Sequence, residues 1–584
     1  MHGAGCSTTT RTTPQTPSGP PGPTPRRRAD MTRFTRRTFA AGSAATLTAA
    51  ALAACSFDRG TGGGEGEDAP RDIHWLGWGG TTWNQNFNLF SPTGVNVTPG
   101  TSFVYEPLLR VDRSTAGELL PHLAESWEFN DEGTELTFTL VSDVTWSDGE
   151  PFTAGDVKFT WDLVLAGKTP NSYPFASVEA PDDQTVVVTY DEPSFADLVG
   201  FATRQIVPEH VWAEQDVRTW TNPEPVGTGP GVLASFSPQQ IAFDLREDYW
   251  GGAPSGPNKL FMHAVTGDAA KQQLIDGTLD VGGTGWENAD EEFVALDPEN
   301  NVYTFFPVGT ADGLIFNTTQ APYDDVHVRR ALRAAVDLAI AAEVAAVGYS
   351  VPTFAGLDAT VFSEMLAEDQ EQSQDIEYAK AQLEEGGWTV TEAGKLEKDG
   401  ETYELRYDVY QPYAEWVTTG QILADQWNET LGLTVAVNKM ADAPFTEASS
   451  IGDFGMLSYS PFGGSMPYDM FATMSDLQFT PISEQAIWNY GRFQNEEYDE
   501  LVHELGSIPA GEDAERSREL IIRIQEILTE EAPFIATATA GWKLVANEQN
   551  WTGYPTVEGG FDYGPNGTVP ADGILTVMNL EPNS

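Results

Sequence analysis

The chain has 584 residues, is 40% hydrophobic and carries a formal charge of −56 at pH 7. This length supplies enough apolar side chains for a large core and for more than one domain. A surface of this charge repels phosphate backbones, which excludes nucleic-acid binding. We interpret the acidity as a solvated, salt-tolerant surface and assign it no role in ligand binding.

The first 54 residues have the features of an export signal. Arg36 and Arg37 precede Thr38 and Phe39, an arrangement that resembles a twin-arginine signal. The apolar stretch that follows is shorter than the roughly 20 residues needed to cross a bilayer, so it indicates a signal region and not a transmembrane helix. We expect residues 1–54 to be a signal peptide, with Met31 as the translation start.

The signal region ends in Leu-Ala-Ala-Cys at 52–55, which resembles the lipobox of bacterial lipoproteins. Cys55 would then carry diacylglycerol, and two acyl chains suffice for stable anchoring. The alternative is a buried free cysteine after a chance apolar run. Residues 55–70 are rich in Gly and predict a lipidated flexible tether. This places the protein outside the cytoplasmic membrane, held on its outer face by lipid alone.

Only one other cysteine is present, Cys6, and it lies in the segment that we expect to be removed. The folded part therefore has no disulfide and no thiolate metal site. Removing residues 1–54 leaves 24 basic and 86 acidic residues, a formal charge near −62. No GxxxxGK[ST], HExxH or CxxC element occurs, so we predict no cofactor and no metal.

Short strands and helices alternate along the first half of the chain. A strand begins at Ile73, and a loop rich in Asn follows at 83–88. Alternating apolar residues at 136–140 predict a half-buried strand, and another strand is expected at 185–190. Between them, Thr153 and Asp156 form a capping arrangement at the start of a helix.

The run 227–231, Gly-Thr-Gly-Pro-Gly, interrupts the strands and helices. It is not a phosphate loop, because no lysine follows it.

Helical spacing dominates the second half of the chain. Apolar residues from Val328 to Ile340 lie on one face of a single long helix, and a second helix covers 520–528 and ends before Pro533. No internal repeat is present, and the mixture of strands and helices predicts an α/β fold.

Seven segments together resemble the extracellular solute-binding proteins of family 5, the peptide and nickel class of ABC-importer receptors. Their order and spacing extend over nearly the whole chain after the signal region. They are YEPL at 105–108, PHLAESW at 121–127, VTWSDGEPFTAGDV at 144–157, GTGP at 227–230, DYWGG at 248–252, VRRAL at 328–332 and GRF at 491–493.

The resemblance implies a two-lobed fold of the periplasmic-binding-protein type, class II, with a hinge between the lobes and a family-specific subdomain. By analogy, lobe I is expected at 70–111, 209–308 and 535–584. The subdomain would be 112–208 and lobe II 309–534.

The implied function is capture of a solute by closure of the two lobes, followed by delivery to the permease subunits of an ABC importer. Ligand contacts made by both lobes exist only in the closed state, so binding favours closure. No bond is broken, and no enzyme activity is expected. We expect a monomer whose partners are a small ligand, the permease and, through the lipid, the membrane.

The run Gly-Gly-Ser-Met-Pro-Tyr at 463–468 and the segment 83–92 resemble the oligosaccharide-binding branch of this family. The ligand is therefore predicted to be an oligosaccharide, with an oligopeptide as the alternative and nickel as the least favoured. Peptide binders of this family usually hold the α-amino group with an aspartate before a proline in a second-lobe loop. Glycines at 463–464 occupy that place here, and Asp469 would replace the aspartate only if the loop followed a different path.

Aromatic and amide side chains suit sugars, because sugar C–H faces stack on rings while amides donate to and accept from hydroxyls. For any single aromatic residue, ordinary core packing is an equal alternative. The predicted ligand contacts are Trp83, Asn86, Trp286, Trp416, Tyr459 and Tyr468.

A secreted glycoside hydrolase is the remaining rival, since such an enzyme can also be acidic, tryptophan-rich and lipid-anchored. It needs two carboxylates on either side of the scissile bond. With 87 Asp and Glu residues, the sequence does not exclude such a pair by itself. The family resemblance argues against it.

Overall fold

A computed structural model describes the chain from 72 to 583 with short internal gaps. The described residues are 72–77, 80–91, 100–112, 118–167, 175–196, 198–283, 286, 288–346, 356–359, 361–367, 373–462, 466–509, 513–557 and 571–583. The predicted start at Met31, the arginine pair Arg36 and Arg37, and Cys55 lie outside them.

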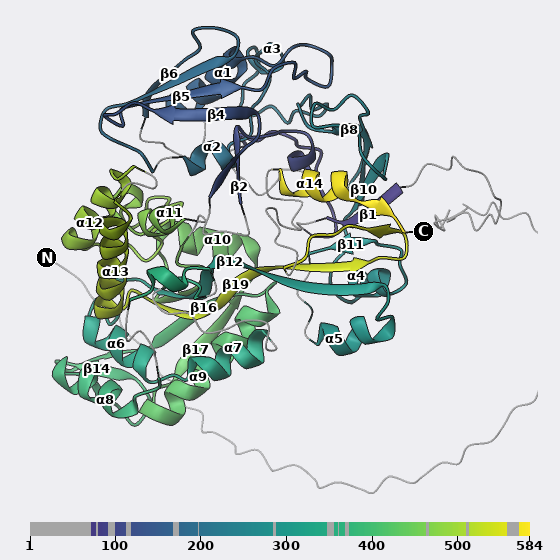
Figure 1. Ribbon diagram of the computed structural model, residues 1–584. Helices are drawn as coiled ribbons and strands as arrows, with labels where there is room; N and C mark the ends of the chain where they lie inside the picture. The colour runs from purple at the N-terminus through teal and green to yellow at the C-terminus, as the bar shows by residue number, and fades with distance from the viewer. Residues whose placement is uncertain are drawn as a thin grey trace, which may run out of the picture. The chain divides into compact units, whose positions relative to one another are not determined.

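One mixed sheet of ten strands organises the fold (Figure 1). Its order is β17-β16-β18-β12-β19-β11-β1-β10-β9-β8. The strands are β1 Asp72–Leu76, β8 Gly231–Ser237, β9 Gln240–Leu245, β10 Lys259–His263, β11 Val281–Gly282, β12 Asn301–Phe316, β16 Leu405–Tyr410, β17 Val435–Met440, β18 Met456–Ser458 and β19 Phe534–Asn547.

The two longest strands, β12 and β19, lie at the centre of this order and pair antiparallel over most of their length. At one end β19 pairs with β11, and at the other β12 pairs with β18. They are therefore shared by a first group of strands, β1 and β8–β11, and a second group, β16–β18. Two long strands that join two groups are the kind of connection expected at the hinge of a two-lobed fold.

The first strand group packs on a large aromatic core that includes Trp75, Phe103 and Tyr105. Short elements complete this part of the chain: η1 Thr101–Phe103, α3 Glu209–Trp212, α4 Gly267–Ile275, α5 Ala289–Glu292, η2 Val294–Leu296, β20 Trp551–Thr552, α14 Asp572–Asn579 and β21 Glu581–Pro582.

The glycines of the run 227–231 allow two backbones to meet. A Cβ atom on Gly227 would lie 1.8 Å from the carbonyl oxygen of Val104, and one on Gly229 would lie 2.4 Å from that of Phe103. Gly229 also donates its N–H to Val104. The run is a packing contact, which explains its glycines without any phosphate.

A separate four-stranded sheet, ordered β4-β5-β7-β6, carries helix α1. The alternating strand is confirmed, with Leu136, Phe138 and Leu140 buried. The predicted cap is also confirmed, because Thr153 and Asp156 form a reciprocal capping box. This part of the chain also contains a two-stranded sheet, β2-β3, and a short helix, α2. Its elements are β2 Leu109–Val111, β3 Leu119–Pro121, β4 Ala124–Phe129, β5 Glu135–Leu140, α1 Ala154–Leu165, β6 Phe175–Glu179, β7 Thr185–Tyr190 and α2 Val199–Thr203.

Three of the recognised segments meet at the buried carboxylate of Glu106. His122 Nε2 lies 2.9 Å from it, the hydroxyl of Tyr249 donates at 2.6 Å, and the indole of Trp250 donates at 2.9 Å. Burial alone would raise the pKa of Glu106, but these hydrogen bonds outweigh it and the pKa is lowered. The YEPL, PHLAESW and DYWGG segments therefore share one structural role, which is to hold this carboxylate.

The second strand group is covered by helices around two buried clusters. Its elements are α6 Val326–Ala334, α7 Leu338–Ala346, η3 Ser363–Met365, α8 Ile376–Glu385, β13 Thr389–Val390, β14 Leu396–Lys398, β15 Glu401–Tyr403, α9 Ala414–Leu431, α10 Asp442–Ile451, α11 Pro467–Ala472, η4 Asp476–Gln478, α12 Glu496–Gly506 and α13 Ala514–Glu531. The predicted helix over 520–528 is confirmed within α13, whose apolar face is buried.

The single long helix predicted from Val328 to Ile340 is wrong. The chain forms α6 and α7 with a break at 335–337. Asp337 causes the break, because its side chain accepts from the N–H groups of Ala339 and Ile340 and so starts a new helix. Helical periodicity continues through the break, which is why the apolar pattern did not reveal it.

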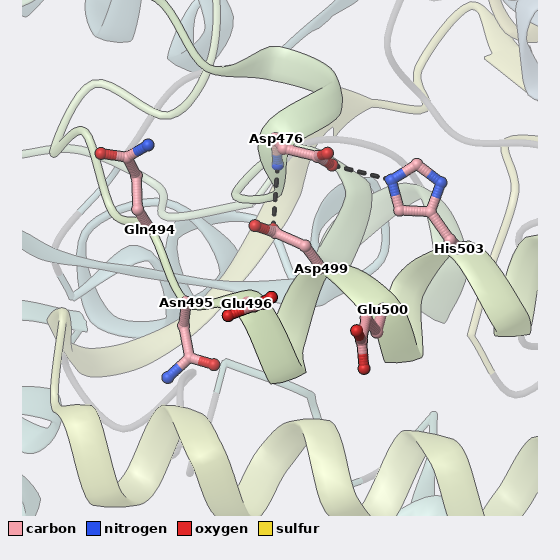
Figure 2. Close-up of a pocket in the computed structure, with 7 residues that line it drawn as sticks. All are labelled: Asp476, Gln494, Asn495, Glu496, Asp499, Glu500 and His503. Atoms are coloured by element: carbon pink, nitrogen blue, oxygen red, sulfur yellow. Dashed lines mark hydrogen bonds and ion pairs between the residues drawn. The ribbon is translucent and has the colours of Figure 1, made fainter.

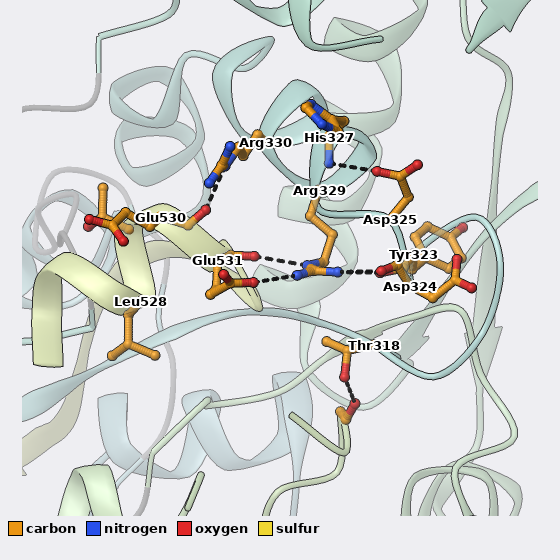
Figure 3. Close-up of polar contacts among 12 residues, drawn as sticks. Thr318, Tyr323, Asp324, Asp325, His327, Arg329, Arg330, Leu528, Glu530 and Glu531 are labelled. Atoms are coloured by element: carbon orange, nitrogen blue, oxygen red, sulfur yellow. Dashed lines mark hydrogen bonds and ion pairs between the residues drawn. The ribbon is translucent and has the colours of Figure 1, made fainter. Parts of the chain in front are cut away.

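Arginines of the VRRAL segment join α6 to the end of α13 (Figure 3). Arg329 donates to the carbonyl of Tyr323 at 2.8 Å and to that of Glu531 at 3.0 Å, while Arg330 donates to the carbonyl of Glu530. The last carbonyls of a helix lack intrahelical donors, so cations there stabilise it. This segment holds two helices together and needs no ligand to explain it.

Candidate functional site

The carboxyl ends of two parallel strands bring aromatic residues together. Strands β16 and β18 pair in parallel and end at Tyr410 and Ser458. Helix α9 starts just after β16, with Trp416 in its first turn. Ligands of open α/β sheets bind outside the carboxyl ends of the strands, which makes this edge the candidate site.

Six rings form one connected group, which we call the aromatic cluster. Five of its members are half-buried and Phe445 is buried. Trp416 lies 5.0 Å from Tyr413 and 6.2 Å from Tyr459 between ring centroids, and Tyr459 lies 4.7 Å from Tyr490. The members are Tyr410, Tyr413, Trp416, Phe445, Tyr459 and Tyr490.

A carboxylate from the long strand β12 lies at the same edge. Leu314 pairs with Ser458, and Tyr459 donates its N–H to the carbonyl of Gly313. Asp312 is therefore next to Tyr459, and its side chain is hydrogen-bonded to that of Trp416. The cluster thus combines apolar faces with one half-buried acceptor.

Charged neighbours set the properties of this carboxylate. Burial raises the pKa of Asp312, and Glu415 raises it further, while Lys543 and the hydrogen bond from Trp416 act in the opposite direction without cancelling the rise. Lys543 lies 3.9 Å from Glu415, which links strand β19 to the first turn of α9. The phenol of Tyr490 also has a raised pKa, first because of burial and then because of Tyr459.

Two of the predicted contacts, Trp416 and Tyr459, belong to the aromatic cluster. Trp83 and Asn86 do not; both are buried, and Trp83 packs in the aromatic core of the first strand group. Asn86 accepts from the backbone N–H of Asn88, so it stabilises its own loop. These two residues are explained by packing and by a turn.

Trp286, Tyr468 and Asp469 also lie outside the cluster. Trp286 is buried beside Phe293, and its indole donates to Glu292. Tyr468 and Asp469 lie in the first turn of helix α11, and Tyr468 packs on the helical core of the second strand group. Gly463 and Gly464, which stand where peptide binders have their aspartate, lie outside the described residues.

Sequence reasoning missed five residues of this site: Asp312, Tyr410, Tyr413, Phe445 and Tyr490. The run Tyr-Gln-Pro-Tyr at 410–413 carried a usable signal, because it follows an apolar strand and precedes a helix. Asp312 gave none, since only the pairing of β12 with β18, about 140 residues later in the chain, brings it beside Tyr459. Tyr490 gave none either, because it lies in a turn outside the helices and strands.

A depression lies over the start of α12, apart from the aromatic cluster (Figure 2). His503 Nε2 lies 2.8 Å from Asp476, whose own N–H donates to Asp499. It is lined by Asp476, Gln494, Asn495, Glu496, Asp499, Glu500 and His503. Asn495 caps the helix, and Glu496 and Asp499 lie in its first turn, so these groups stabilise the helix start.

Within the described part of the chain, no group of three or more His, Cys, Asp or Glu side chains is arranged to hold a metal ion. None of the helices in this part has the length and apolar character needed to span a membrane.

The chain is similar to known proteins both in sequence and in structure. The sequence profile of the bacterial extracellular solute-binding proteins, family 5 (middle region), matches residues 118–479. Protein XP55 of Streptomyces lividans is 30% identical over 483 residues, which cover 76% of this chain and 84% of that protein.

Solved structures of binding proteins share the fold. The periplasmic oligopeptide-binding protein of Thermotoga maritima superposes with a TM-score of 0.77 at 23% identity, covering 88% of this chain and 99% of that one. The same protein with bound mannohexaose gives 0.75, also at 23% identity, over 89% and 100%. The oligopeptide-binding protein AppA of Bacillus subtilis, in complex with a nonapeptide, gives 0.71 at 18% identity over 88% and 100%.

The fold is that of a two-lobed periplasmic binding protein, in agreement with the α/β prediction. The family match extends over more than half of the chain, so the protein belongs to the extracellular solute-binding proteins of family 5. It is the substrate-binding component of an ABC importer, acts outside the cytoplasm with a permease, and is not an enzyme.

Proposed function

We propose that the protein binds an oligosaccharide at the aromatic cluster and delivers it to its permease. The observation that carries this proposal is the set of five half-buried rings beside Asp312 at the strand ends. Sugar C–H faces stack on such rings, and a carboxylate accepts hydrogen bonds from hydroxyl pairs. The mannohexaose complex of the Thermotoga protein supports the same ligand class.

Strands β12 and β19 supply the hinge in this scheme. Asp312 lies on β12, so a ligand that it holds contacts the strand about which the lobes move. Contacts added by the first lobe on closure exist only in the closed state, and they shift the equilibrium toward it. The permease then recognises the closed form.

The proposal includes export and anchoring. The signal at 1–54, with Arg36 and Arg37, would direct export, and diacylglycerol on Cys55 would hold a monomer at the outer face of the membrane. Residues 55–70 would form the tether, followed by lobe I at 70–111, 209–308 and 535–584, the subdomain at 112–208 and lobe II at 309–534. A tether of this kind raises the effective concentration of the receptor near the permease.

An oligopeptide is the second candidate ligand. Asp312 favours it, because a half-buried carboxylate among aromatic rings also suits an α-amino group. The nonapeptide complex of the Bacillus protein shows that this fold accommodates peptides. Under this alternative, Asp312 or Asp469 would hold the amino terminus, and Trp83, Asn86, Trp286 and Tyr468 would remain core or lobe-surface residues.

A thermal-shift panel of oligosaccharides and short peptides tests the proposal on the protein without residues 1–55. A ligand at 100 times its dissociation constant stabilises the folded state by about 2.7 kcal/mol. We expect a shift with glycans such as mannohexaose and none with peptides. Shifts with peptides alone would replace the proposal by the second candidate.

Ligand affinity is expected to depend on pH through Asp312. Its raised pKa means that the carboxylate becomes protonated at a higher pH than an ordinary aspartate, so affinity falls as the pH falls through that value. Calorimetric titrations between pH 7 and pH 4 would show this decline. Asp312→Asn should bind more weakly at pH 7 and lose the dependence, and a decline that persists in this variant would assign it to another group.

A further inference from the structure

The GRF segment at 491–493 contains a buried arginine, Arg492, which is not part of the aromatic cluster. Arg492 is 1% exposed and has a left-handed backbone, with φ of 56°. No carboxylate among the described residues pairs with it. Burying a guanidinium without a carboxylate partner is costly, so the hydrogen bonds of Arg492 must offset this cost.

Those hydrogen bonds connect three segments of the chain, one of which carries Tyr490 of the aromatic cluster. Arg492 donates to the carbonyls of Tyr490 at 3.0 Å, of Ser450 at the end of α10 at 2.8 Å, and of Glu484 at 3.2 Å. Asn489 adds bonds to the carbonyls of Met474 and Phe493. The backbone on both sides of Tyr490 is thereby fixed.

The same turn is attached to the hinge strand. A Cβ on Gly491 would lie 2.5 Å from the carbonyl oxygen of Phe316, the last residue of β12. Thr318 donates its N–H and its hydroxyl to the carbonyl of Gly491, each at 2.9 Å, and the hydroxyl also reaches the carbonyl of Arg492. The turn therefore connects β12, which carries Asp312, to the ring of Tyr490.

We infer that Arg492 is a positioning residue for ligand binding: it holds Tyr490 against Tyr459 and in register with Asp312 on the hinge strand. It acts through Tyr490 and does not itself contact the ligand. This inference rests on the proposed function for the identity of the ligand surface, but the placement of Tyr490 can be tested without any ligand.

Fluorine NMR of protein labelled with 3-fluorotyrosine provides that test, with the Tyr490 signal assigned from Tyr490→Phe. In Arg492→Lys, which keeps the charge but cannot reach all these carbonyls, the Tyr490 signal should move or broaden. Arg329→Lys is the matched control, because Arg329 is 4% exposed and also donates to carbonyls, at the α6–α13 junction. It should leave the Tyr490 signal unchanged.

Thr318→Val provides a milder variant should Arg492→Lys fail to fold, because it removes one hydroxyl from the same turn; it too should displace the Tyr490 signal. With mannohexaose as probe, Arg492→Lys should raise the dissociation constant about tenfold or more, and Arg329→Lys should not. A Tyr490 signal unchanged in folded Arg492→Lys, or moved equally by Arg329→Lys, would overturn the inference. Absence of mannohexaose binding by the wild type would count against the proposed ligand, and the NMR result would still decide the role of Arg492.

Discussion

Replacing Trp416 with alanine is expected to weaken ligand binding about 30-fold or more. Trp416 is central to the aromatic cluster, with ring contacts to Tyr410, Tyr413 and Tyr459, and it is hydrogen-bonded to Asp312. Anchoring aromatic residues of this kind contribute at least about 2 kcal/mol to binding. Calorimetric titration with the strongest glycan of the panel measures the loss.

Trp127→Ala is the matched control for this variant. Trp127 is also half-buried, but it lies on β4 in the four-stranded sheet, away from the strand ends that carry the aromatic cluster. It should retain wild-type affinity. Equal affinities for Trp416→Ala and the wild type would show that the cluster is not the ligand surface.

Replacing Glu106 with alanine is expected to cost about 3–5 kcal/mol of folding free energy. The variant leaves His122, the Tyr249 hydroxyl and the Trp250 indole without their shared acceptor in a buried site. Urea unfolding of the two proteins measures the difference. A loss below about 1 kcal/mol would contradict the role assigned to the three recognised segments.

The surface pair of Asp148 and His210 offers a matched control. Its side chains also lie 2.9 Å apart, but both are about a third exposed. Asp148→Ala should therefore cost about 1 kcal/mol or less.

The contribution of Glu106 to stability should also depend on pH, because the pKa of its carboxyl is lowered in the folded protein. This contribution is present above the ordinary glutamate value of 4.5 and is lost as the pH falls below it. The wild type should therefore lose more stability on acidification than Glu106→Ala.

The parts of the fold that depend on neighbouring residues in the chain could be predicted from the sequence. The β5 strand, the α1 capping box and the buried face of α13 follow from alternation, a three-residue spacing and helical periodicity. The break between α6 and α7 could not, because Asp337 interrupts the backbone without interrupting the apolar pattern. Capping by one side chain outweighed periodicity there.

The candidate site shows the same division. Residue type suggested aromatic ligand contacts, but Trp83 and Trp286 have the same type and are core residues, since exposure is decided by tertiary packing. Trp416 and Tyr459 come together with Asp312 only because β12 pairs with β18, which follows it by about 140 residues in the chain. Such long-range pairing leaves no local pattern.

The structure of the protein with the best glycan of the panel bound tests the central claim most directly. We predict sugar rings stacked on Trp416 and Tyr459, a hydroxyl donating to Asp312, and further contacts from the first lobe that close the hinge. A glycan bound elsewhere, or a peptide with its amino group at Asp312, would contradict the oligosaccharide assignment.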